Sequence, residues 1–201
     1  MQSAKVILLC TVAAAAYGVA HDQITVRVCP AYFAVAHPPY FPTSNLTLLA
    51  LCWGIASSAW LGAILGGLLA LVTSSAGQRA VSSERLVRGV ITLLGVMAAA
   101  ALTAGVIGYN LAHHSLVPLP TSIADALPAE QRDRFVAVWF AHIASYGGAI
   151  LGGLALINQH WRERGRPAVL RLYPATAFGA ARVATLCAIV GVIIYVRVRG
   201  S

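Results

Sequence analysis

Three long stretches of this chain contain no charged side chain, and they restrict its fold more than any other feature. No Asp, Glu, Lys or Arg occurs at 28–78, 89–124 or 135–161. Apolar stretches of this length are typical of membrane-spanning helices, which need about 20 residues. A soluble fold would have to cover several helices that are apolar on every side, and 201 residues are too few for that. The sequence therefore predicts an all-α membrane protein.

A six-residue sequence, AILGGL, occurs twice, at 63–68 and again at 149–154. Each copy belongs to a pattern of small residues four apart, which lets two helices approach closely in lipid. The glycines of the two patterns are Gly62, Gly66, Gly148 and Gly152. The repeat predicts a duplicated two-helix hairpin that forms a four-helix transmembrane bundle, with the two glycine faces in its central helix contact.

The uncharged stretches and the loops between them divide the chain into five predicted spans. The expected segments are an N-terminal transmembrane anchor at 1–20, an outer loop at 21–45, a first helical hairpin at 46–112, a second outer loop at 113–134, and a second hairpin at 135–201 with a charged inner loop at 158–182. The small residues that end the first segment also fit the cleavage site of a signal peptide, so the sequence leaves both alternatives open. Alternating apolar residues at 24–28 predict a short extended segment, and the last span is expected at about 177–196.

Lysine and arginine are distributed unequally between the loops. If the N-terminus and the loops at 73–88 and 158–182 lie inside, nine of these residues are inside and five are outside. Inner loops of membrane proteins carry the excess of positive charge. The bias predicts a multi-pass protein with its N-terminus inside and its C-terminus outside. The net charge of +8 is explained by these loops, and no basic patch interleaved with aromatics indicates nucleic-acid binding.

The outer side of the predicted bundle collects most of the histidines. The candidate metal ligands there are His21, Asp22, His37, His113, His114 and His142. Imidazole and carboxylate groups suit copper or zinc, and an ionisable group within a span is by default a candidate functional residue. We expect the outer loop, rich in Tyr, Phe and Pro, to fold over the bundle and bring these residues together.

Several alternatives remain at this point. His142 could be a neutral imidazole bonded to Ser145 or to a carbonyl, and haem b could lie between His142 and His113 or His114. Cys29 could act as a nucleophile with His21 or His37 as its base. The four cysteines have no metal-binding spacing.

The string HDQITVRVCPAYF, followed by HPPYF and a span that contains Trp-Gly, resembles an uncharacterised family of small bacterial multi-span integral membrane proteins. The resemblance extends over most of the chain. It implies a helical membrane fold and the inner membrane of a bacterium, but no activity.

Two classes of function stay open. The first is a binding or assembly protein whose outer histidines take a metal, a haem or a membrane-protein partner, including a second copy of the chain. The second is a small membrane enzyme or carrier that uses the same outer cavity. No carboxylate lies within the long uncharged spans, which disfavours a proton-coupled carrier of the common kind.

Overall fold

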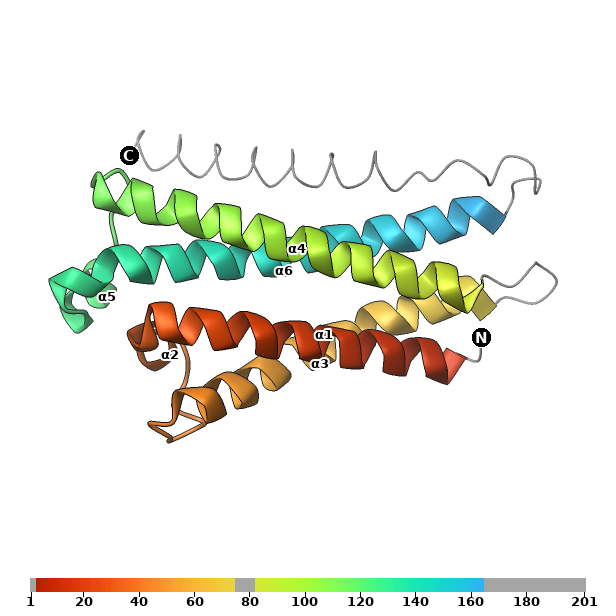
Figure 1. The fold of residues 1–201 in the computed structure, drawn as a ribbon, viewed down its shortest axis with the longest axis horizontal. Helices are drawn as coiled ribbons and strands as arrows, with labels where there is room; N and C mark the ends of the chain where they lie inside the picture. The colour runs from red at the N-terminus through yellow and green to blue at the C-terminus, as the bar shows by residue number, and fades with distance from the viewer. Residues whose placement is uncertain (1–2, 75–81, 165–201) are drawn as a thin grey trace.

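The computed structural model of the protein describes residues 3–74 and 82–164, and this part of the chain is helical and contains no strand (Figure 1). Its elements are α1 (Ser3–Val28), α2 (Pro30–Val35), α3 (Leu46–Ser74), α4 (Ser83–His113), α5 (Thr121–Ala126), the 3-10 helix η1 (Ala129–Gln131) and α6 (Arg132–Arg164). The prediction of an all-helical protein is confirmed for these residues. The predicted fifth span and most of the inner loop at 158–182 lie outside them.

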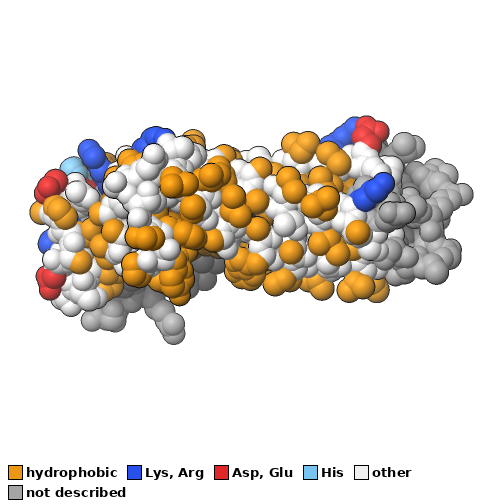
Figure 2. Space-filling model, turned by 90° about the horizontal axis from the view of Figure 1, so that it is seen from below, with side chains coloured by type: hydrophobic (Ala, Val, Ile, Leu, Met, Phe, Trp, Pro, Cys, Tyr) orange, Lys and Arg blue, Asp and Glu red, His pale blue; other side chains and the backbone are white. Residues whose placement is uncertain are grey.

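Four of the helices are long and apolar enough to cross a membrane. They are α1, α3, α4 and the helical segment Ala129–Arg162, with lengths of 26 to 34 residues. Many large apolar side chains, such as Leu71, Leu102 and Ile91, are exposed along them. Figure 2 shows charged side chains at the two ends of one face and none along the middle. Apolar exposed sides with charged ends suit a lipid bilayer and support a multi-pass membrane protein.

The long helices are arranged as two closely packed pairs, α1 with α3 and α4 with α6, and contacts between the pairs are fewer (Figure 1). Glycines on α3 explain the first pair. A Cβ atom on Gly62 would lie 2.6 Å from the Cys10 carbonyl oxygen and 2.6 Å from the Ala14 Cβ atom, both on α1. Because glycine leaves this space free, the two backbones can approach closely.

Gly148 and Gly152 of α6 face α4 in the same way. A Cβ atom on Gly148 would lie 3.1 Å from the Met97 side chain, and Gly152 faces Leu93. The predicted central contact between the two glycine faces is therefore wrong, because each face packs on the long helix that precedes it in the chain. The helix pairs also differ from the predicted hairpins, which would have placed α3 with α4.

The end of the bundle that carries α2 begins with an unbroken extension of α1. The extended segment predicted at 24–28 is wrong, because α1 continues to Val28 and the Cys29 amide still donates to the Thr25 carbonyl oxygen. Helical hydrogen bonds satisfy every backbone group near lipid, which an isolated strand cannot do. Pro30 then opens α2, a position where its missing N–H costs nothing.

The loop helix α2 packs on the ends of the long helices. Its Tyr32 and Phe33 are buried in one apolar cluster with Val26, Trp53 and Phe135, which come from α1, α3 and α6. This cluster fixes the position of the chain between α1 and α3 and closes that end of the space between the helix pairs.

Candidate functional site

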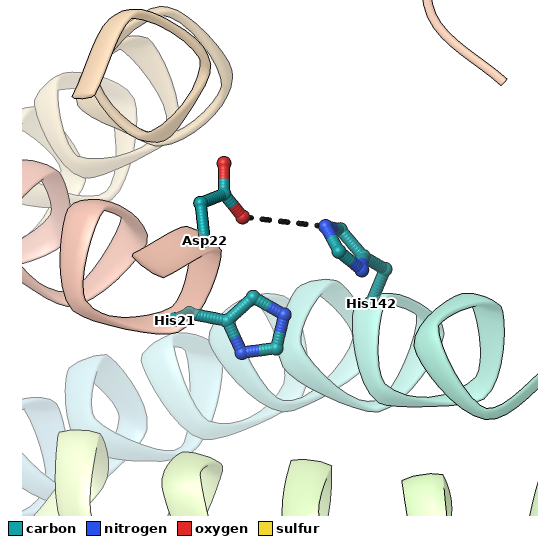
Figure 3. A group of neighbouring side chains, drawn as sticks. All are labelled: His21, Asp22 and His142. Atoms are coloured by element: carbon teal, nitrogen blue, oxygen red, sulfur yellow. Dashed lines mark ion pairs between the residues drawn. The ribbon is translucent and has the colours of Figure 1, made fainter. Parts of the chain in front are cut away.

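Three side chains from two helices meet between the helix pairs. His21 and Asp22 are consecutive residues on α1, and His142 is on α6 (Figure 3). One potential ligand atom from each of them lies within 4.8 Å of the others. These three residues are called the His-Asp-His cluster below. The cluster lies two turns or less before the end of α1, and the Tyr32 and Phe33 rings of α2 lie beside His142.

His142 is held in a defined orientation. Its Nδ1 atom lies 2.9 Å from the carbonyl oxygen of Val138. A carbonyl only accepts, so Nδ1 carries a hydrogen, and in the neutral imidazole Nε2 then presents its lone pair. Nε2 lies 3.3 Å from an oxygen of Asp22, and the two side chains are 6% and 5% exposed. Two acceptor atoms do not face each other at this distance unaided, so either a proton carried by one of the two groups or a metal ion must lie between them.

His21 is oriented by a short chain of hydroxyl groups. The Tyr17 hydroxyl lies 2.9 Å from Ser145 Oγ, which is 3.5 Å from His21 Nδ1. Among the described residues, the Nε2 atom of His21 is buried and has no hydrogen-bond partner. The ring centroids of His21 and His142 are 4.7 Å apart. The free nitrogen of His21 therefore lies beside the pair formed by Asp22 and His142.

His37 is next to the cluster but not within it. Its ring stacks on Phe33 and lies 4.4 Å from the Trp53 ring and 6.4 Å from the His142 ring, measured between centroids. Burial lowers the pKa of His37, and the nearby His142 lowers it further. Its buried Nδ1 atom has no hydrogen-bond partner among the residues the structure describes.

His113 and His114 are placed elsewhere. His113 pairs with Asp133 at 3.1 Å, and its side chain is 61% exposed. Asp133 precedes His142 by nine residues on α6, about 13 Å along the helix axis. The six residues expected to share one site are thus divided. The rings of His113 and His114 meet edge to face, away from the cluster. This separation gives a haem ligated by His113 and His142 no support.

Cys29 does not have the environment of an activated thiol. It is buried among apolar side chains, and this burial raises the pKa of its thiol. Catalytic cysteines need the opposite shift, because the thiolate is the nucleophile. The structure therefore favours a packing role for Cys29 over the nucleophile considered from the sequence.

A cavity of about 100 Å³ continues from the cluster into the bundle between the two helix pairs. Its polar end contains the cluster, together with the side chains of Ser57 on α3 and Tyr146 on α6. Its other end is lined by apolar side chains such as Met97 and Leu156. The sequence reasoning did not single out Tyr17 or Ser57, although Tyr17 stands one helical turn before His21 and thus on the same face.

Comparisons with protein-family models, with curated proteins and with solved structures gave no match to this chain. The function of the protein is therefore inferred from the arrangement of the site.

Proposed function

We propose that this protein binds a divalent transition-metal ion in its membrane bundle, with His21, Asp22 and His142 as ligands. The observation that carries this proposal is the convergence of three potential ligand atoms within 4.8 Å, in a place where two of the side chains are almost fully buried. Ionisable side chains are rare within membrane spans because they are costly there, and a bound ion would offset that cost.

The distances suit a tetrahedral ion after a small movement of one ring. Ligand bonds of about 2.1 Å at tetrahedral angles separate the ligand atoms by about 3.4 Å. The Asp22 and His142 atoms are already 3.3 Å apart. The His21 ligand atom lies within 4.8 Å of the others, so it must approach by at most about 1.4 Å to reach the same spacing.

The surroundings of each imidazole also favour metal binding. Metal-bound histidines almost always donate their second ring nitrogen to a carbonyl or another polar group. His142 makes this contact with the Val138 carbonyl, and His21 places Nδ1 beside Ser145. His142 therefore directs Nε2 toward Asp22, and Nε2 is the ring nitrogen of His21 that has no partner among the described residues. Two imidazoles with one carboxylate suit zinc, copper or iron, and three protein ligands leave a coordination position open, as in catalytic sites.

The competing explanation is that Asp22 and His142 share a proton and only link α1 to α6. Metal analysis of the protein in lipid nanodiscs, after exposure to zinc and removal of excess, separates the two. We expect one zinc per chain, loss of zinc from His142→Ala and His21→Ala, and retention by His113→Ala as the matched control. A wild-type protein without zinc would leave the proton-sharing pair as the explanation.

We place the cluster toward the outer face of a bacterial inner membrane, with the N-terminus inside. Arg85 and Arg88 at the start of α4 lie at the opposite end of the bundle from α2, and this charge supports the orientation. The resemblance to bacterial membrane proteins supports the location.

We further propose that the duplicated unit comprises a long helix, a short loop helix and a second long helix. The offset of 86 residues that relates the two AILGGL sequences also aligns 3–28 with 89–114, which is α1 with most of α4. His21 and Asp22 then correspond to Ile107 and Gly108. A duplicated scaffold would thus carry a single metal site, because only the first copy has the ligands from α1.

A further inference from the structure

The cavity below the cluster is long, narrow and mostly apolar. It follows α6 from His142 to Leu156, fourteen residues or about 21 Å along the axis. Small side chains such as Ala13 and Ala149 line its middle. Polar groups are gathered at the cluster end, so a molecule that fills the cavity needs a polar head and an apolar body.

The net charge of the metal-loaded site determines which kind of polar head group can bind there. A divalent ion bound by two neutral imidazoles and the Asp22 carboxylate carries a net charge of +1. Among membrane spans an uncompensated charge is costly, and an anion at the open coordination position would remove it. Without the ion, Asp22 would repel the same anion, so anion binding at this place depends on the metal.

We propose that the cavity binds a single-chain carboxylate, of the fatty-acid class, whose carboxylate completes the metal coordination and whose chain lies between the helix pairs. This inference rests on the metal site proposed above. A cavity of about 100 Å³ takes part of one narrow chain and excludes a two-chain lipid. A monoanionic head also matches the +1 charge better than a dianionic phosphate does.

Cobalt-loaded protein tests the inference, since the visible spectrum of Co²⁺ reports a change of ligand. The protein in nanodiscs is titrated with acetate, octanoate and octanol. We expect both carboxylates to change the spectrum and octanol to leave it unchanged. Octanoate should bind at least about ten-fold more tightly than acetate, because each methylene removed from water favours binding by about four-fold.

Two alanine variants test the role of the cavity. Ala149→Leu should keep the cobalt spectrum and acetate binding but lose the advantage of octanoate, because the new side chain fills the cavity about 10 Å below His142. Ala99→Leu, on the exposed side of α4, should behave as wild type. If Ala149→Leu fails to bind cobalt, Ala13→Leu on α1 provides the same block.

The outcomes separate the two proposals. Absence of a cobalt spectrum in the wild type overturns the metal site, and the carboxylate inference with it. A normal cobalt spectrum that no carboxylate changes leaves the metal site standing and overturns the inference. Equal affinities for acetate and octanoate, or an octanoate advantage that persists in both blocked variants, would also overturn it.

Discussion

Substitution of Gly62 by alanine tests the close contact between α1 and α3. A Cβ atom at this position would lie 2.6 Å from the carbonyl oxygen of Cys10 and 2.6 Å from Ala14 Cβ. Neither neighbour is the flexible end of a side chain, so the two helices must separate. Overpacking of this kind costs about 1–3 kcal/mol. For a chain of this length, that corresponds to a fall of roughly 2–12 °C in melting temperature.

Gly67 is the matched control on the same helix. A Cβ atom there would meet nothing within 4 Å. Alanine is favoured over glycine inside a helix by about 0.5–1 kcal/mol, so Gly67→Ala should raise the melting temperature slightly. Both variants are measured by thermal unfolding in one detergent, with helix content as the readout. Equal melting temperatures for the two variants would show that Gly62 does not lie against α1.

Three further predictions concern topology, packing and thiol reactivity. Cysteines introduced at the exposed positions Ser83 and Ser122 should be labelled from opposite sides of the membrane, and labelling from one side only would refute the orientation. Gly66→Leu and Gly152→Leu should each lower the melting temperature by several degrees, because they face α1 and α4 closely; unchanged stability would place both on lipid. With Cys29 as the sole cysteine, alkylation at pH 7.5 should be slow until the protein is denatured, because burial raises the pKa of this thiol and keeps it protonated; rapid labelling of folded protein would contradict its packing.

The helical class and the long spans could be predicted because the membrane leaves the backbone few alternatives. Stretches such as 28–78 without charge must satisfy their backbone groups internally where they cross, and a helix does so. The partner of each helix was not predictable in the same way. Small residues four apart indicate that one face of a helix packs closely on another helix. They do not indicate which helix that is. Gly62 required a neighbour with small side chains, and Ala14 on α1 provides it.

The candidate site was predicted in part, and the reason lies in depth along the helices. His21 and Asp22 follow one another on α1, and His142 was expected to lie below the outer end of its span. The sequence did not show how far α1 would continue or how α4 would align with α6. As a result His113 was grouped with His142, whereas it lies level with Asp133. The helical extension to Val28 placed His21 and Asp22 deeper than the predicted loop would have.

X-ray absorption spectroscopy at the zinc edge, on zinc-loaded protein in nanodiscs, tests the metal site most directly. The proposed site predicts two imidazole nitrogens at about 2.0–2.1 Å with oxygen ligands completing the shell. His142→Ala should reduce the imidazole contribution or abolish binding, and His113→Ala should leave the spectrum unchanged. A zinc shell without imidazole, or one that is the same in wild type and in a protein that lacks both His21 and His142, would contradict the proposed site.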